Sequence, residues 1–107
     1  MNTLNERRKA ARLKVNSSVV CYLRVVDDEY SGILRDMSVT GLFLELKAPA
    51  QPSGTCEVEI VLNGDNSRLK IECQGSIVRY DEEGVAVHFD SRMEWFPIVA
   101  TYFQRRL

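Results

Sequence analysis

The sequence predicts an all-β protein, a small six-stranded antiparallel β-barrel with a C-terminal α-helix. Its 107 residues suffice for one domain, and the shares of hydrophobic residues (45%) and charged residues (27%) are those of a globular protein. Apolar and polar residues alternate through most of the segment from 19 to 89, which is typical of strands with one face on a core. After residue 95 the apolar spacing changes to three and four residues, which is typical of a helix.

Five alternating runs define most of the strands. Their apolar faces consist of Val19, Cys21, Leu23 and Val25; of Leu42, Leu44 and Leu46; of Cys56, Val58, Ile60 and Leu62; of Leu69, Ile71 and Cys73; and of Val85, Val87 and Phe89. Polar residues occupy the opposite faces. Short strands of this kind, joined by tight turns, fit a closed barrel because closure leaves no exposed sheet edge.

Turn-forming residues separate the runs. The alternation is interrupted at 27–29, at the proline-containing stretch 49–54 and at 81–84. Residues 63–66 contain an Asn-Gly pair, which favours a hairpin. Near Gly75 the apolar positions change parity, which predicts a β-bulge or a bend in one long strand.

The C-terminal segment has helical periodicity. Its apolar positions are Phe96, Val99, Ala100, Phe103 and Leu107. Two arginines, at 105 and 106, lie at the predicted C-terminus, where the helix dipole favours positive charge. We expect the helix to cover one opening of the barrel, with Trp95, Phe96 and Phe103 packed in the core.

Charge divides the chain into two parts. The net charge is −1, but residues 1–14 contain five basic residues and one acidic residue. We therefore predict a flexible basic N-terminal arm at 1–14, without a fixed counter-charge, and a barrel domain at 15–107. No apolar run is long enough to span a membrane, and the arm lacks the apolar core of a signal peptide. We expect a cytoplasmic protein that makes no membrane contact.

Metal, cofactor and enzyme chemistry find little support in the sequence. Cys21, Cys56 and Cys73 are odd in number, form no C-x-x-C pair and lie among apolar residues, so we expect buried thiols in a reducing compartment. His88 is the single histidine, and its strand position faces away from the core. Ser38 lacks the G-x-S-x-G context of a nucleophile. We predict no zinc site, no cofactor and no catalytic activity.

Two short segments are not required by the hydrophobic pattern, namely Arg7–Arg12 in the arm and Asp36–Gly41 between the second and third strand candidates. An arginine fork binds phosphate oxygens or the O6/N7 edge of guanine, and its flat face stacks on a base. The Asp36 carboxylate can accept two parallel hydrogen bonds from guanine, and the Ser38 hydroxyl can donate or accept. Gly41 allows a backbone turn or the close approach of a ligand. These residues together suit an anionic ligand that carries guanine.

The two segments resemble the signature of PilZ domains, R-x-x-x-R followed by [D/N]-x-S-x-x-G. The matching residues are Arg8 and Arg12 in the first part and Asp36, Ser38 and Gly41 in the second, with the additional Arg7 also typical of the family. The layout is similar over nearly the whole chain, including a strand at 84–89 before the final helix.

The resemblance implies a six-stranded barrel that binds cyclic di-GMP without chemical change. Arg8 and Arg12 would contact phosphates and guanine edges, with Arg7 as an accessory contact. Asp36, Ser38 and Gly41 would hold a guanine against the barrel wall. The resemblance also implies an adaptor that changes conformation and signals to a protein target, in motility, polysaccharide synthesis, secretion or transcription.

Two alternatives stay open at this point. In the first, the chain has the same barrel fold but acts only as a protein-interaction module. In the second, the chain is a barrel of the OB or SH3 type that binds nucleic acid through its basic arm. Against the second alternative, aromatic residues make up only 8% of the chain and none lies near the signature arginines in the sequence. A net charge of −1 also attracts nucleic acid weakly.

Overall fold

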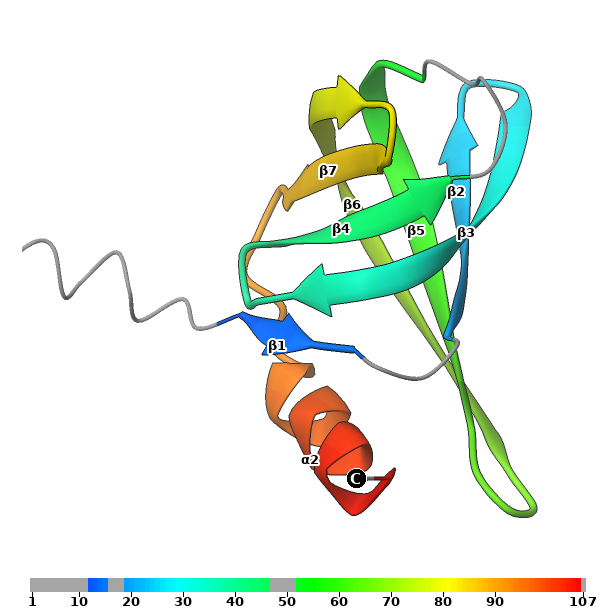
Figure 1. Cartoon of the computed structure of the whole chain (residues 1–107), viewed down its shortest axis with the longest axis vertical. Coiled ribbons are helices and arrows are strands. Elements are labelled where there is room, and N and C mark those ends of the chain that lie inside the picture. Colours follow the sequence, from blue (N-terminus) through cyan, green and yellow to red (C-terminus); the bar gives the residue numbers. More distant parts are fainter. Residues whose placement is uncertain (1–11, 16–18, 47–51, 107) are drawn as a thin grey trace, which may run out of the picture.

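The computed structural model describes residues 12–15, 19–46 and 52–106, with side chains up to residue 102. The elements are β1 (Leu13–Lys14), β2 (Val20–Val25), β3 (Asp28–Met37), β4 (Gly41–Leu46), β5 (Gly54–Asn63), β6 (Arg68–Asp81), β7 (Gly84–Phe89) and α2 (Phe96–Arg106). Strands dominate, as the alternating pattern predicts, and the one helix of the described residues lies at the C-terminal end (Figure 1).

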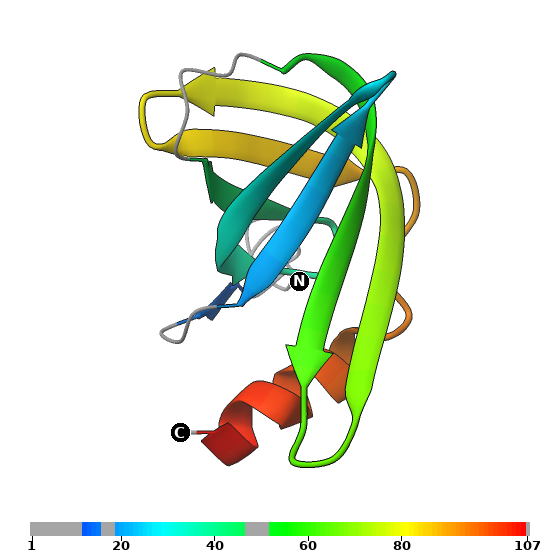
Figure 2. The same cartoon turned by 90° about the vertical axis from the view of Figure 1, so that its right-hand side faces the viewer.

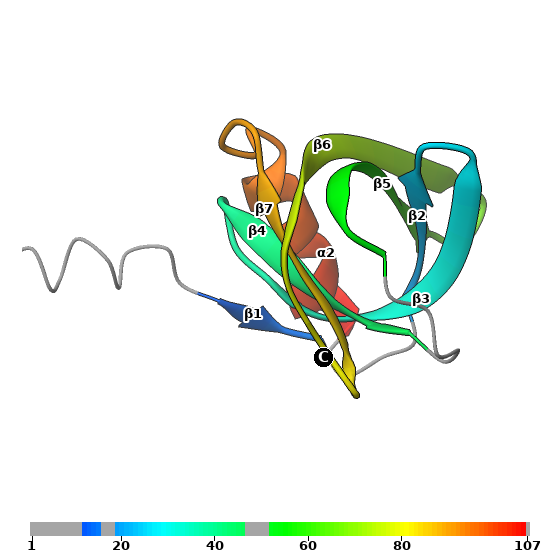
Figure 3. The ribbon, with the colours of Figure 1, turned by 90° about the horizontal axis from the view of Figure 1, so that it is seen from above.

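Six strands close into an antiparallel barrel, which confirms the predicted fold class. The sheet order is β3, β2, β5, β6, β7 and β4, and the pairing of β4 with β3 completes the circle. Figure 3 shows how β2, β3, β5 and β6 curve around the interior. β1 is an additional two-residue strand that pairs with the end of β3.

The predicted alternation corresponds to burial. Every position assigned to the apolar faces of β2, β4, β5 and β7 is buried, and His88 on the opposite face of β7 is exposed. Cys21 and Cys56 are buried and Cys73 is half-buried, all as free thiols. The prediction is wrong for Leu69, which is 45% exposed. This end of β6 extends past the barrel in the hairpin with β5, beside α2 (Figure 2).

The long strand β6 pairs with β5 along its first part and with β7 along its second part. The register shifts between Ile77 and Arg79, so the bulge predicted at Gly75 lies three residues later. Gly75 has a different reason to be glycine. An ideal Cβ there would lie 2.2 Å from the carbonyl oxygen of His88, because β6 and β7 approach closely at this point.

The C-terminal helix α2 lies against one end of the barrel, as predicted (Figure 1). Val99 is fully buried and Phe96 packs partly against the core, while the Tyr102 hydroxyl donates a 2.9 Å hydrogen bond to the Asn63 carbonyl in the β5–β6 hairpin. The prediction that Trp95 packs in the core is wrong, since 59% of it is exposed. Trp95 lies in the turn before the helix, where helical periodicity does not yet apply. No described helix is long and apolar enough to cross a bilayer.

The basic segment 1–14 joins the barrel earlier than its composition indicates. Leu13 and Lys14 form β1 opposite Met37 and Asp36, and Leu13 packs against the core. The Val15 amide then donates a 2.9 Å hydrogen bond to the Arg35 carbonyl. These apolar and backbone contacts fix residues 13–15 against β3. Residues 1–11 lie outside the described part, as does the Phe103 side chain.

Candidate ligand-binding site

The segment Asp36–Gly41 connects β3 to β4 in a tight turn. The Ser38 amide donates a 2.8 Å hydrogen bond to the Gly41 carbonyl, which closes the turn. Ser38 itself is fully buried, and its hydroxyl lies 3.1 Å from the Thr40 hydroxyl while accepting a 3.2 Å bond from the Thr40 amide. The sequence predicts Ser38 as a ligand contact. In this structure its hydroxyl bonds within the turn, to Thr40.

Gly41 is required by the packing of two strands. An ideal Cβ at Gly41 would lie 2.3 Å from the carbonyl oxygen of Val87 on β7, which is far inside van der Waals contact. Gly41 is paired with His88 in the β4–β7 ladder, and it is not among the glycines with positive φ. β7 therefore approaches Gly41 so closely that a side chain at this position would meet the Val87 backbone.

Arg12 and Asp36 bring the two signature segments into direct contact. The Arg12 Nε donates to Asp36 Oδ1 at 2.7 Å, and Arg12 Nη2 lies 2.5 Å from the same oxygen. The pairing of Lys14 with Asp36 sets this geometry, because it places the start of β1 beside the end of β3. The expectation that the arm has no fixed counter-charge is wrong for Arg12. Arg7 and Arg8 lie outside the described residues.

An aromatic ring lies next to this pair on the outer face of the barrel. Phe43 of β4 is directly opposite Asp36 of β3, and the Arg79 guanidinium lies over the Phe43 ring, 5.6 Å from its centroid. β7 lies between β4 and β6, and its residue Ala86 is the cross-strand partner of both Phe43 and Arg79. The sequence analysis missed Phe43 and Arg79. The alternation places Phe43 on the outer face of its strand, but only the register shows which residues flank it.

The site thus combines a guanidinium, a carboxylate and a flat ring on one patch of the barrel surface. The Asp36 side chain is 20% exposed and the Arg12 side chain 45%, so solvent or a ligand reaches both. Guanidinium groups bind phosphates, carboxylates accept from the N–H groups of guanine, and a ring beside a cation offers a stacking surface. The arrangement is suited to binding an anion that carries a flat base.

A closed six-stranded antiparallel barrel with a C-terminal helix places this protein in the class of small β-barrel domains. Comparison with known proteins identifies the family. The family model described as "PilZ domain" matches residues 6–94, and the chain therefore belongs to the PilZ domain family. Among curated proteins, none matches the sequence significantly.

Two solved structures share the fold at low sequence identity. The inhibitor of motility MotI/DgrA from Bacillus subtilis superposes with a TM-score of 0.64 at 16% identity, over 89% of this chain and 48% of its own. The present chain thus spans about half the length of that protein. The PilZ domain of CeSA from a cellulose synthesizing bacterium gives a TM-score of 0.56 at 18% identity, over 90% and 98% of the two chains.

Proposed function

We propose that this chain is a cyclic di-GMP receptor that changes conformation on binding and signals to a partner protein. The contact between Arg12 and Asp36 carries the proposal. These residues are 24 positions apart in the sequence, and the fold brings them together on an exposed patch. Arg7, Arg8, Ser38 and Gly41 complete the proposed site, the last two by holding the turn in shape. As a receptor for an intracellular messenger, the protein would act in the cytoplasm.

The chemistry of the ligand matches the chemistry of the patch. Cyclic di-GMP has two phosphates for arginine forks and two guanines whose pairing edges carry adjacent N–H groups. Both contacts from Arg12 fall on Oδ1 of Asp36. The second oxygen, Oδ2, can accept from guanine while Oδ1 keeps Arg12 in place. Asp36 would therefore both orient an arginine for phosphate and recognise a base.

The position of β1 limits how far the other arginines can reach. Arg8 lies four positions before Arg12 in the sequence, which corresponds to at most about 14 Å of extended chain. Because Arg12 is held at Asp36, Arg8 and Arg7 stay within reach of a ligand seated on that patch. We expect the ligand to draw residues 1–11 onto the barrel, so that an ordered arm changes the surface shown to a partner.

Calorimetry tests the identity of the ligand. We expect the purified chain to bind cyclic di-GMP in preference to cyclic di-AMP and GTP, with salt-sensitive affinity because arginine–phosphate contacts contribute. Equal binding of cyclic di-AMP would contradict the role of Asp36 in guanine recognition. Absence of binding to all three would favour the protein-interaction module.

Hydrogen exchange tests the conformational step. Amides of residues 5–11 should exchange more slowly when cyclic di-GMP is added, because ordering a segment protects its amides. Residues 56–62 of β5 serve as an internal control, since they lie in the paired interior of the barrel and should change little. Unchanged exchange in 5–11 at saturating ligand would exclude ordering of the arm as the signal.

A further inference from the structure

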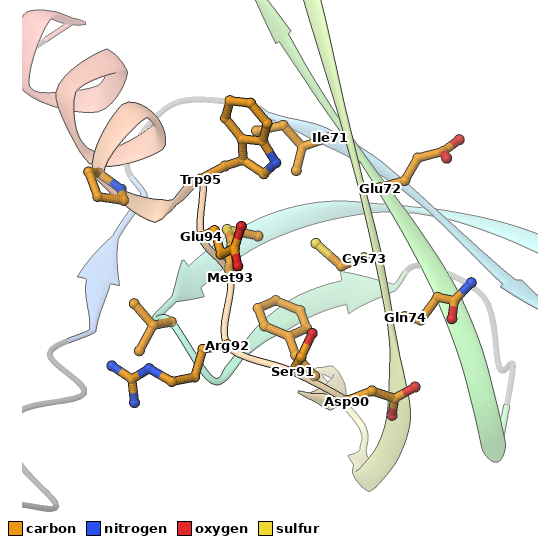
Figure 4. A pocket seen from close by; sticks show the side chains of 13 residues that line it. Ile71, Glu72, Cys73, Gln74, Asp90, Ser91, Arg92, Met93, Glu94 and Trp95 are labelled. Atoms are coloured by element: carbon orange, nitrogen blue, oxygen red, sulfur yellow. The ribbon is translucent and has the colours of Figure 1, made fainter.

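A cleft lies between β6 and the connection from β7 to α2. Its volume is about 830 Å³, and its walls come from residues 71–74, residues 89–95 and Pro97, with Val39 of the signature turn at one side (Figure 4). The proposed cyclic di-GMP site does not use this cleft, because Arg12 and Asp36 are not among its lining residues.

Acidic side chains dominate the charge of the cleft. Glu72, Asp90 and Glu94 contribute three carboxylates against the single guanidinium of Arg92. All four residues are exposed, and within the described part of the chain none of the three carboxylates has an ion-pair partner. Figure 4 shows Arg92 directing its guanidinium away from the β6 wall and Glu72 directing its carboxylate away from residues 91–95, so Asp90 and Glu94 are the carboxylates of the β7–α2 connection at the cleft. The cleft therefore favours a positively charged occupant.

Apolar groups lie among these charges. Trp95 at the helix end of the cleft is 59% exposed. Buried side chains of Phe89 and Met93 form part of the floor. An exposed tryptophan beside a hollow of this size is costly to leave in water, and tryptophan is enriched among residues that dominate the energy of protein interfaces.

The wall of the cleft is hydrogen-bonded to the signature turn. The Met93 amide donates to the Val39 carbonyl at 2.8 Å, and the Phe89 amide donates to the Thr40 carbonyl at 2.8 Å. Both acceptors lie in the turn that follows Asp36. A shift of this turn would therefore move the segment that carries the carboxylates and Trp95.

We propose that this cleft is the docking surface for a basic segment of the partner protein. The segment would place one aromatic or aliphatic side chain against Trp95, flanked by lysine or arginine residues that pair with Asp90 and Glu94. Ligand binding at Asp36 would alter its affinity through the hydrogen bonds to Val39 and Thr40, and this last step rests on the proposed function. The same carboxylates repel anionic membranes and nucleic acids, which the structure thus disfavours as occupants.

Peptide selection tests the surface directly. A displayed library of random peptides of about 12 residues, long enough for an anchor with flanking charges, is selected on the full chain. We expect enrichment of an aromatic or aliphatic residue flanked by lysine or arginine. The selected peptide, fluorescently labelled, is then titrated by anisotropy, and the intrinsic emission of Trp95, the single tryptophan, should shift to the blue as the indole is covered.

Matched variants assign the binding to this cleft. Trp95→Ala should weaken the peptide at least about tenfold, as expected for a central interface residue. Tyr80→Ala, which removes an aromatic 42% exposed elsewhere on β6, should leave the affinity unchanged. The double variant Asp90→Asn with Glu94→Gln should weaken peptide binding, and most strongly at low salt. The control double variant Glu82→Gln with Glu83→Gln, in the β6–β7 turn, should leave the peptide affinity unchanged.

Each result separates docking from ligand binding. The docking surface would be overturned if selection enriched no pattern or an acidic one, or if Trp95→Ala bound the peptide fully. Capture of phosphatidylglycerol vesicles in place of peptides would overturn it as well. Cyclic di-GMP should change peptide affinity in the parent chain and not in Asp36→Ala. If the ligand binds by calorimetry but leaves peptide affinity unchanged, the coupling is wrong. If the ligand does not bind while the peptide does, the proposed function fails and the docking surface stands.

Discussion

Arg12 and Arg24 lie on the outer surface of the same barrel and are exposed to a similar degree, 45% and 39% of their side chains. Their surroundings differ. Arg24 contacts three carboxylates at 2.9 Å each, those of Glu29, Glu57 and Glu59. Among the residues that the structure describes, Arg12 contacts one carboxylate, that of Asp36.

Strand register produces the difference. Arg24 on β2 is directly opposite Glu29 on β3 and Glu57 on β5, so its guanidinium ties three strands together. The hydrogen bond to Glu59, followed by that to Glu57, raises the pKa of Arg24 above its usual value. Arg12 lies just before β1, and its partner within the described residues is on β3. Exposure alone therefore does not identify an arginine that can bind an anion. The number of carboxylates already paired with the guanidinium identifies it, because these carboxylates compete with the anion.

The largest expected effect is on ligand affinity. Arg12→Ala and Asp36→Ala should each weaken cyclic di-GMP binding by about 10- to 150-fold, the equivalent of about 1.5–3 kcal/mol for a charge-assisted hydrogen bond. Arg24→Ala is the matched control and should bind normally, since its charge is already neutralised by three carboxylates. Calorimetry measures all three. A large loss in Arg24→Ala would break the comparison.

The second prediction concerns the packing beneath the site. Gly41→Ala should lower the free energy of unfolding by about 1–3 kcal/mol, since a new Cβ must displace the Val87 carbonyl. Gly64→Ala is the control, because its Cβ would approach closely only the rotatable Ser67 hydroxyl, with the Ser67 carbonyl oxygen at an ordinary contact distance of 3.7 Å. Urea denaturation measures both. Equal stability of the two variants would mean that β4 and β7 yield easily near the site.

The third prediction concerns pH and the strand that carries Arg24. Burial raises the pKa of Cys21 from about 9 to about 12. Below pH 9 the thiol is neutral in the folded and unfolded chains, so its contribution to stability is fully present. Above pH 9 only the unfolded chain loses the proton, and stability should fall by up to about 1.4 kcal/mol per pH unit.

Urea denaturation at several pH values between about 7 and 11 checks this linkage. Cys21→Ala should show a shallower fall in stability above pH 9 than the parent chain, since the other titrating groups are unchanged. Identical slopes would mean that the Cys21 thiol ionises in the folded barrel, and that the interior beneath β2 is more open to water than its full burial indicates.

The smallest expected effect is on thermal stability. Arg24→Ala should lower Tm by a few degrees, because it leaves the largely buried Glu59 with Lys70 as its remaining cation at 3.7 Å. Arg12→Ala should change Tm by about one degree or less, as is usual for an exposed pair. Arg24→Lys keeps the charge without the fork and should fall between. If Arg12→Ala lowered Tm more than Arg24→Ala, the ranking of the two arginines by their contribution to stability would be reversed.

Several features were predictable because they depend on local pattern. The alternation at Cys56, Val58, Ile60 and Leu62 identifies a buried strand face wherever that strand pairs, and all four residues are buried. The Asn63-Gly64 pair likewise marks the hairpin that joins β5 to β6. Such signals need no knowledge of distant residues.

Other features were not predictable because they depend on register. The sequence gives Phe43 an outward position but not Asp36 and Ala86 as its cross-strand neighbours. It places a bulge near Gly75, whereas the pairing with β7 shifts after Ile77. A slip of one residue in either ladder would exchange inner and outer faces, so these neighbours follow only from the closed barrel.

The sequence by itself determined that this chain forms a barrel with a terminal helix and carries both parts of a PilZ signature. Period and spacing suffice for this, because burial faces repeat every two residues in strands and motifs are read along the chain. Only the tertiary structure decided that Arg12 meets Asp36, that Ser38 is buried in its turn, and that Trp95 stands exposed beside an acidic cleft. These depend on which strands close against each other, and closure joins residues whose separation along the chain carries no signal of their contact.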